Sequence, residues 1–148
     1  MTSLPFIDLH SVDVAAPPDA AWRAIGHIMG RQSWSPVRAF ATVLGTDPRG
    51  TQGDSLIVGS TIPGFRISAA VPGERVVFAG RHRFSEYELI FELDAHDDGT
   101  QVRALTYARF PGPHGRAYRA MVIGSGFHRI AVRRMLREIA RAAESTEG

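Results

Sequence analysis

Residues 86–93 hold the most constraining pattern in this chain, because polar and apolar side chains alternate there with a period of two. One face carries Tyr87, Leu89, Phe91 and Leu93, and the other carries Glu86, Glu88, Ile90 and Glu92. Such alternation is typical of a strand with one buried face and one solvated face. The segment therefore predicts an antiparallel sheet that is covered on one side only.

Turn-forming residues divide the rest of the middle of the chain into short segments of similar character. Pro-Gly pairs at 63–64 and 72–73 favour type II turns, and Asp98-Gly99 favours a tight hairpin. An antiparallel meander is expected from this spacing. We predict strands near residues 6–15, 38–46, 54–62, 65–71, 75–81, 84–95 and 100–110.

Helical patterns lie before and after these strands. The first helical region starts at Pro17-Pro18-Asp19, carries Trp22, Ile25 and Ile28 on one face, and ends by Gly30. The second runs from about Gly115 to Glu144 without an internal proline, and it would be about 40 Å long at 1.5 Å per residue. It is the only large element available to bury the apolar side of the sheet.

Composition indicates a single soluble domain over residues 1–148. Hydrophobic residues make up 44% of the chain and charged residues 22%, and the net charge is +2. Cysteine is absent, which excludes disulfides and thiolate chemistry, and all 17 Lys/Arg residues are arginine, which excludes lysine Schiff bases. Without a membrane-length apolar run or an export signal, we expect a cytoplasmic protein with no membrane insertion.

Several kinds of functional site find no support in the residue spacing. The histidines are dispersed without an i, i+4 pair, and no phosphate loop, dinucleotide fingerprint or Gly-x-Ser-x-Gly elbow is present. Arg81-His82-Arg83 is interpreted as a solvated hairpin, because no basic stripe with interleaved aromatics surrounds it. We therefore expect no metal, no cofactor and no nucleic-acid partner.

Four segments along the chain together resemble a known superfamily. They are Val12–Trp22, Ser33–Pro36, Leu93–Val102 with its Gly99-Thr100, and Phe110-Pro111-Gly112 followed by a helix with Arg133-Arg134-Met135-Leu136. Their order and spacing are similar to those of the START/Bet v 1-like (SRPBCC) superfamily, which includes polyketide cyclases/dehydrases and lipid-transport proteins. The resemblance covers nearly the whole chain, but the superfamily shares no catalytic motif.

The resemblance implies an α+β helix-grip fold. In that fold a curved seven-stranded antiparallel sheet surrounds a long C-terminal helix, with two short helices after strand 1. It also implies an internal cavity for an apolar or aromatic ligand.

The C-terminal helix supplies the first candidate site residues. Its core stripe comprises Ala131, Val132, Met135, Leu136, Ile139 and Ala143. Extended backwards, the stripe passes through His128, Ser125 and Met121. We expect these three to line the cavity, with His128 as the best candidate for proton transfer or ligand orientation. The alternative is a histidine satisfied in the core or at the rim.

Further candidates come from the strands. Tyr87, Leu89 and Phe91 share the inward face, and Tyr87 either presents its hydroxyl to a ligand or packs as a core aromatic. His10 follows Val12 and Val14 inward if that face is buried, and the alternative is a frayed strand start with His10 in solvent. For the last strand, the set containing Thr106 is favoured as inward, because the alternative set carries Arg103 and Arg109. Phe65 and Ile67 are expected in the apolar wall, and Trp34 as a lid.

A second copy of the chain is a candidate partner. Ile123, Phe127 and Ile130 form an apolar patch on an otherwise charged helix face, which indicates either a homodimer contact or cover by a loop.

Three functions remain open. The first is binding of a lipid- or polyketide-like ligand, and the second is a polyketide cyclase, aromatase or dehydratase that uses His128 and Tyr87. The third is an interaction protein with a filled interior. An enzyme needs several titratable groups around one point, and a carrier does not. The sequence places only one or two such groups inward, which favours binding.

Overall fold

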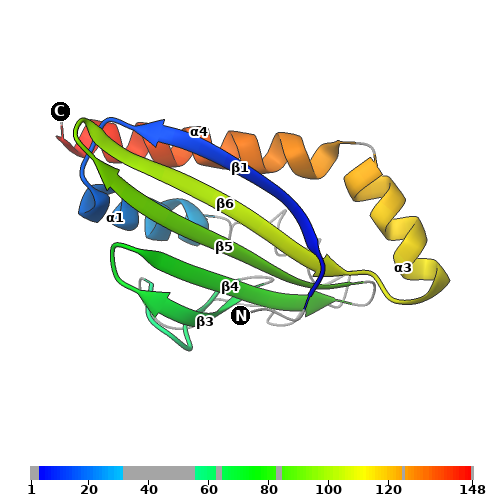
Figure 1. Cartoon of the computed structure of the whole chain (residues 1–148). Helices are drawn as coiled ribbons and strands as arrows, with labels where there is room; N and C mark the ends of the chain where they lie inside the picture. The colour runs from blue at the N-terminus through cyan, green and yellow to red at the C-terminus, as the bar shows by residue number, and fades with distance from the viewer. Residues whose placement is uncertain (1–3, 32–55, 63–64, 83–84, 125, 148) are drawn as a thin grey trace.

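The structure of the chain, a computed structural model, describes residues 4–31, 56–62, 65–82, 85–124 and 126–147. Within these residues, an antiparallel sheet with the strand order β1-β6-β5-β4-β3-β2 lies against two helices, as Figure 1 shows. The strands are β1 (Phe6–Val14), β2 (Thr61–Ile62), β3 (Phe65–Val71), β4 (Arg75–His82), β5 (Ser85–His96) and β6 (Gly99–Arg109). The helical segments are α1 (Pro18–Arg31), α3 (Gly112–Arg119), η1 (Ala120–Gly124) and α4 (Phe127–Glu147).

The α+β class and the meander are confirmed. Strands β3 to β6 follow one another as antiparallel neighbours, and β1 pairs with β6. The predicted strand at 54–62 is wrong over residues 56–60, which form a turn region with φ +95° at Gly59. The strand β2 is limited to Thr61–Ile62, although Gly59 and Ser60 also make backbone hydrogen bonds to Ile67 of β3. The predicted strand at 38–46 lies outside the described residues, as does the place for a second short helix. The described sheet therefore has six strands, and one helix follows β1.

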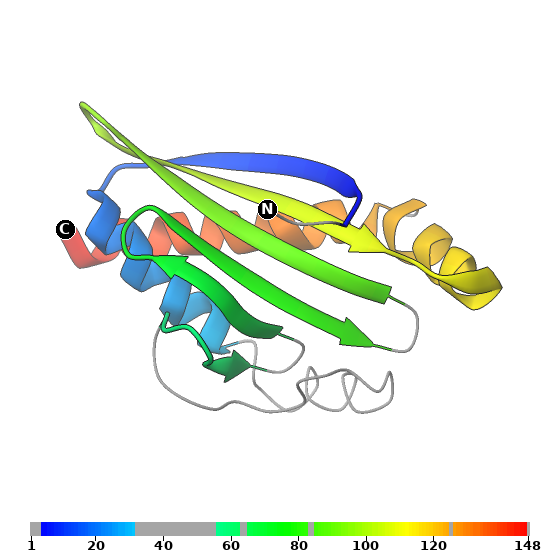
Figure 2. The same cartoon turned by 60° about the horizontal axis from the view of Figure 1, so that its bottom comes forward.

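The core lies between one face of the sheet and the pair of helices α1 and α4, which pack against each other. Figure 2 shows both helices on the same side of the sheet. The largest side chains with less than 2% exposure come from all of these elements: Phe78, Phe91, Ile25, Met29, Leu136 and Ile139. Among the described helices, none combines the length and apolar character that a membrane span requires.

The C-terminal region is not the single helix expected over 115–144. Helix α3 is followed directly by the π-helical η1, and α4 is a separate helix that begins at Phe127. Gly126 has φ +82°, a left-handed conformation that interrupts a right-handed helix and that glycine adopts without strain. The Gly124-Ser125-Gly126 triplet therefore marks a break, and the helical wheel of α4 cannot be extended across it to Ser125 and Met121. Within α4 the expected core stripe holds except at Ala131, which is exposed.

The sheet end near the β5–β6 hairpin is fixed to the link between β1 and α1. A Cβ on Gly99 would overlap the carbonyl oxygen of Val14, so the two backbones approach as closely as glycine permits. Thr100 Oγ1 donates a hydrogen bond to the Ala16 carbonyl at 2.8 Å. The Ala15 N–H donates to Glu144 Oε2 at 2.9 Å, which ties the end of α4 to the same link.

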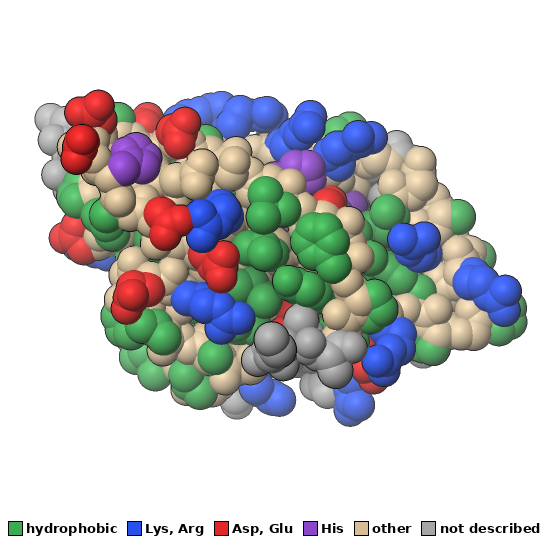
Figure 3. Space-filling model, viewed as in Figure 1, with side chains coloured by type: hydrophobic (Ala, Val, Ile, Leu, Met, Phe, Trp, Pro, Cys, Tyr) green, Lys and Arg blue, Asp and Glu red, His purple; other side chains and the backbone are tan. Residues whose placement is uncertain are grey.

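The outer face of the sheet is less polar than the carboxylates of β5 predict. Cross-strand pairing forms an outer row of Leu9, Leu105, Ile90 and Val77. Within this row Ile90 and Val77 are each only 4% exposed. Figure 3 shows hydrophobic side chains gathered in the middle of this face, with charged groups beside them.

The adjoining outer row contains Arg103, which pairs with Asp94 and with Glu92 at 3.2 Å. The hydrogen bond to Asp94 raises the pKa of Arg103 above its ordinary value. Ion pairs and an apolar row therefore lie side by side on the face that was expected to be solvated.

Candidate functional site

Cross-strand pairing aligns the inward side chains in rows that change from apolar to polar across the sheet. One row contains Ile67, Phe78, Leu89, Thr106 and Asp8. The next contains Val76, Phe91, Ala104 and His10. The β3–β5 end of each row is apolar, and the β1 end carries an ionisable side chain.

Four aromatic rings on this face form a continuous series, which we name the aromatic wall (Phe65, Phe78, Tyr87 and Phe91). Phe65 packs edge to face on Tyr87 at 5.3 Å and on Phe78 at 6.0 Å, and Phe78 packs on Phe91 at 5.9 Å. Such contacts match the positive edge of one ring with the negative face of another. Phe78 and Phe91 lie in the core, whereas Phe65 and Tyr87 are only half-buried. The exposed part of the wall is therefore its Phe65–Tyr87 end.

The polar ends of the rows meet the start of α4 in a group that we name the polar cluster (Asp8, His10, Thr106 and His128). His10 Nε2 lies 3.2 Å from Asp8 Oδ2, and His128 Nε2 lies 3.1 Å from Thr106 Oγ1. His128 Nε2 is also 3.5 Å from Asp8 Oδ1. The side chains of Asp8, His10 and His128 retain 26%, 12% and 21% exposure, so each is largely withdrawn from solvent.

A β-bulge places the side chains of Phe6 and Asp8 on opposite faces of the sheet. Phe6 pairs with Tyr107 and Asp8 with Thr106, so Ile7 is an extra residue in β1. In a regular strand Phe6 and Asp8 would point to the same side. The bulge instead lets Phe6 pack on Tyr107 at 5.6 Å while Asp8 joins the inward row with Thr106.

One acceptor in the polar cluster is unsatisfied. Asp8 Oδ1 is buried and accepts no hydrogen bond from the part of the chain that the structure describes. His128 Nε2 is near it, but the short contact of that nitrogen is with Thr106. A buried carboxylate oxygen normally has a donor, and among the described residues the ion-pair contact with His128 Nε2 at 3.5 Å is the one found at this atom.

The polar cluster can bind polar groups and move a proton. An imidazole beside a carboxylate can accept a proton, because the carboxylate stabilises the imidazolium that forms. A metal ion is not supported, since the described residues contain no group of three or more His, Cys, Asp or Glu arranged to hold one.

Comparison with known families agrees with this arrangement. Residues 10–144 match the family described as polyketide cyclase / dehydrase and lipid transport. The chain belongs to this family. The matched region includes every strand and helix described above except the start of β1 and the last turn of α4.

Solved structures of other proteins share the fold of this chain. Protein NE0264 from Nitrosomonas europaea is 13% identical with a TM-score of 0.61, and the match covers 99% of each chain. The Aha1 dimer from Colwellia psychrerythraea is 18% identical with a TM-score of 0.57, covering 95% of this chain and 97% of that one.

DynU16, from the dynemicin biosynthetic locus, is 17% identical with a TM-score of 0.51, covering 93% of this chain and 47% of that one. At these identities the likeness shows the fold alone. No curated protein matches the sequence.

Most of the residues predicted for the site lie on the inward face of the sheet. His10, Phe65, Ile67, Tyr87, Leu89, Phe91 and His128 lie in or beside the two rows. Thr106 is buried at 6% exposure, which confirms the inward phase favoured for its strand. Trp34 and Ser125 lie outside the described residues, and so does the side chain of Met121.

Asp8 was missed by the sequence reasoning, although a signal was present. The alternation that directs His10, Val12 and Val14 inward also directs Asp8 inward, two residues before His10. An aspartate at an inward position of a strand needs a partner or a function, and pairing with His10 and His128 supplies one.

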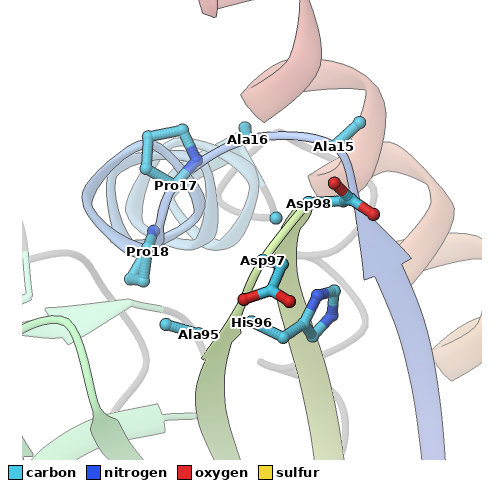
Figure 4. A pocket seen from close by; sticks show the side chains of 9 residues that line it. Ala15, Ala16, Pro17, Pro18, Ala95, His96, Asp97 and Asp98 are labelled. Atoms are coloured by element: carbon cyan, nitrogen blue, oxygen red, sulfur yellow. The ribbon is translucent and has the colours of Figure 1, made fainter.

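A separate groove of about 380 Å³ lies at the opposite end of the sheet. Figure 4 shows it between the β5–β6 hairpin and the link to α1, with Pro17 and Pro18 on one side and His96 and Asp97 on the other. Its remaining lining is mostly alanine. None of the predicted site residues lies there, and Gly99 and Ala16 in its wall belong to the fixed junction described above.

Proposed function

We propose that this chain binds an apolar or aromatic small molecule, lipid-like or polyketide-like, in a cavity between the inward face of the sheet and α4. The observation that carries the proposal is the change along the inward rows from the aromatic wall to the polar cluster. Small-molecule sites are mostly apolar with a few convergent polar groups. Membership in the polyketide cyclase / dehydrase and lipid transport family supports the same class of ligand.

The proposed roles follow from burial. Phe65 and Tyr87 are half-buried and would contact the ligand. Ile67 and Leu89 are 4% and 6% exposed, so their proposed place in the lining is behind these two rings. Phe91 is 0% exposed, so it would support the wall from behind rather than touch the ligand. His10 and His128 would orient the ligand's polar group. The lining roles of Trp34, Met121 and Ser125 stay predictions.

A ligand screen tests this proposal. Thermal unfolding would be followed with a fatty acid, a steroid and an anthraquinone, and native mass spectrometry would detect retained ligand. A ligand at 100 times its Kd stabilises the native state by about 2.7 kcal/mol, a shift of about 5–10 °C here. Tyr87→Ala should reduce the shift, whereas Tyr107→Ala, which alters a tyrosine of the neighbouring strand on the outer face, should not. The proposal fails if no member of the screen is retained or stabilises the protein.

A second candidate is acid–base catalysis of the cyclase, aromatase or dehydratase type at the same site. Asp8, His10 and His128 bring several titratable groups around one point, which a carrier does not need. In this role His128 would take a proton from an activated carbon of the substrate, and Asp8 would stabilise the imidazolium. Tyr87 stays the proposed second acid–base partner.

Deuterium exchange at the activated C–H of 2-acetyl-1-tetralone, followed by NMR, tests this second candidate. We expect exchange faster than in buffer, and a loss of at least about tenfold in His128→Gln. His96→Gln, an exposed histidine at the far end of the sheet, is the matched control. Equal rates for the native protein and His128→Gln would exclude His128 as the catalytic base and leave ligand binding as the function.

The proposed partner is a second copy of this chain, in contact through the patch of Ile123, Phe127 and Ile130. Ile130 is 65% exposed, which is unusual for a large apolar side chain. Ile123 is half-buried, and the side chain of Phe127 lies outside the described residues.

A further inference from the structure

The exposed side of α4 carries a row of positive charges. Four exposed arginines spaced four residues apart make up this row, which we name the arginine row (Arg129, Arg133, Arg137 and Arg141). Four residues are slightly more than one helical turn, so these side chains follow one another along about 18 Å of the helix. Figure 3 shows basic side chains gathered along the edge of the molecule where Figure 1 places α4.

The charge of the arginine row is not neutralised by the part of the chain that the structure describes. No carboxylate among those residues pairs with a side chain of the row. Glu138 Oε1 lies instead 3.4 Å from Arg134 Nε, and Glu144 Oε2 accepts a backbone N–H from the link before α1. By contrast, Arg103 on the outer sheet face pairs with two carboxylates. Like charges one turn apart repel each other, so an anionic partner would relieve a repulsion within the row.

The composition of α4 indicates which anionic partner fits. Guanidinium groups bind phosphate well, and a row about 18 Å long suits a surface with repeated phosphates. Nucleic acids and anionic bilayers both present such a surface. Nucleic-acid sites commonly combine basic with aromatic side chains, and α4 contains no aromatic residue from the phenylalanine-like ring set after Phe127. The residue types of α4 therefore favour a bilayer.

An exposed aliphatic side chain beside the arginine row also favours a bilayer. Ile130 is 65% exposed and lies on the same side of α4. Helices that lie at a membrane surface combine arginines with aliphatic side chains, which enter the boundary between headgroups and acyl chains. Because the proposed dimer contact uses Ile130 too, the chain would meet the bilayer as a monomer.

We propose that α4 docks this chain on anionic phospholipid bilayers through the arginine row. The proposal goes beyond the proposed function, because it concerns where the chain binds and holds whether or not it carries an apolar ligand. Each arginine close to an anionic bilayer strengthens binding about fivefold. Salt weakens such contacts, since the Debye length falls from about 30 Å at 0.01 M to about 3 Å at 1 M.

Co-sedimentation with large unilamellar vesicles tests the proposal. Vesicles of phosphatidylcholine alone are compared with vesicles of phosphatidylcholine and phosphatidylserine in equal parts. The native protein should sediment with the anionic vesicles at low salt and stay in solution with the neutral ones. It should leave the anionic vesicles as the NaCl concentration rises to about 1 M.

A triple variant locates the contact on α4. Losing three arginines should weaken binding to the anionic vesicles about 100-fold, since each contributes about fivefold. The changes are Arg133→Gln, Arg137→Gln and Arg141→Gln. Lysine at the same three positions keeps the charge and should bind within about threefold of the native protein.

A second triple variant is the matched control. It removes the same charge from the outer face of the sheet, opposite α4, where cross-strand pairing places three other arginines. The changes are Arg66→Gln, Arg81→Gln and Arg109→Gln. This variant should bind the anionic vesicles within about threefold of the native protein, because charges on the far face are screened. Circular dichroism checks that each variant keeps the native fold.

The outcomes that overturn the proposal are specific. They are equal binding of the native protein to neutral and anionic vesicles, binding to neither, and equal losses in the two glutamine variants. Tighter binding of the native protein to a short DNA duplex than to the anionic vesicles would assign the arginine row to nucleic acid instead. Each of these results leaves the proposed ligand binding intact, because that function is tested without vesicles.

Discussion

Two buried threonines on the same face of β6 have different roles. One stabilises the fold, and the other contacts a residue of the candidate site. Thr100 is 0% exposed and donates a hydrogen bond to the Ala16 carbonyl, which holds the hairpin to the link before α1. Thr106 is 6% exposed and contacts the imidazole of His128. The first contact joins two backbone segments, whereas the second positions a side chain that still reaches solvent.

We predict different costs for the isosteric change to valine at these positions. Thr100→Val leaves the Ala16 carbonyl without its donor and should lower the free energy of unfolding by about 1–2 kcal/mol. Thr106→Val should cost less, about 0.5 kcal/mol, because the half-buried His128 can recover a hydrogen bond from water. Urea unfolding of both variants measures the difference, and a larger loss for Thr106→Val would contradict it.

The residues of the site were predictable to the extent that strand alternation determines direction. Alternation was enough for His10, Tyr87 and Leu89, because a period of two depends only on local sequence. The partners in the polar cluster depend on the register of β1 against β6, which pairs Asp8 with Thr106 and has no clear local signal. The contact of His128 with Asp8 joins residues at opposite ends of the chain and was not predictable from the sequence.

At the scale of elements, the break before α4 determines where the site lies. The Gly126 N–H donates to the Ile123 carbonyl, and the Gly126 carbonyl accepts from the N–H of Ile130 in the first turn of α4. His128 therefore sits in the first turn of a helix that starts at the polar cluster. If the helix continued through residues 124–126, the side chains of its first turn, including His128, would point in other directions than they do in α4.

Two glycine substitutions test the importance of this break. Gly126→Ala puts a Cβ on a residue with φ +82° and should cost about 1–2 kcal/mol of unfolding free energy. Gly124→Ala meets open space and should stabilise the protein by about 0.5–1 kcal/mol, because alanine loses less backbone entropy. Urea unfolding gives both values, and stabilisation by Gly126→Ala would show that the break is dispensable.

The elements themselves were predictable in proportion to the length of their patterns. The segment 84–95 was placed almost to the residue as β5, because its alternation is long. The break in the C-terminal region was missed because composition and helical spacing continue through it, and only two glycines mark it. The strand expected at 54–62 was wrong over residues 56–60 because β-prone residues there, such as Ile57 and Val58, form turns and are exposed.

At the scale of the whole molecule, the inward face of the sheet is covered by α1 and α4, while large apolar side chains stay exposed on the outer face of the sheet and on α4. On the outer face of the sheet, Phe6 is 56% exposed and Leu9 46% exposed. On α4, Ile130 is 65% exposed. Either surface could bury its apolar area in an assembly, and the two assemblies differ in their relation to the site. Contact through Ile130 would involve the turn of α4 that carries His128, whereas contact through Phe6 and Leu9 would stack sheets.

The last prediction distinguishes the two assemblies. We expect the native protein to dimerise as its concentration rises from about 10 µM to 1 mM, a range suited to a modest interface. Ile130→Asp places a charge in the proposed contact and should leave a monomer at every concentration. Leu9→Asp, an equivalent change on the outer face, should leave the dimer intact. Light scattering after gel filtration gives the mass. A native protein that stays monomeric contradicts the dimer, and a dimer lost only in Leu9→Asp would place the contact on the sheet, away from His128.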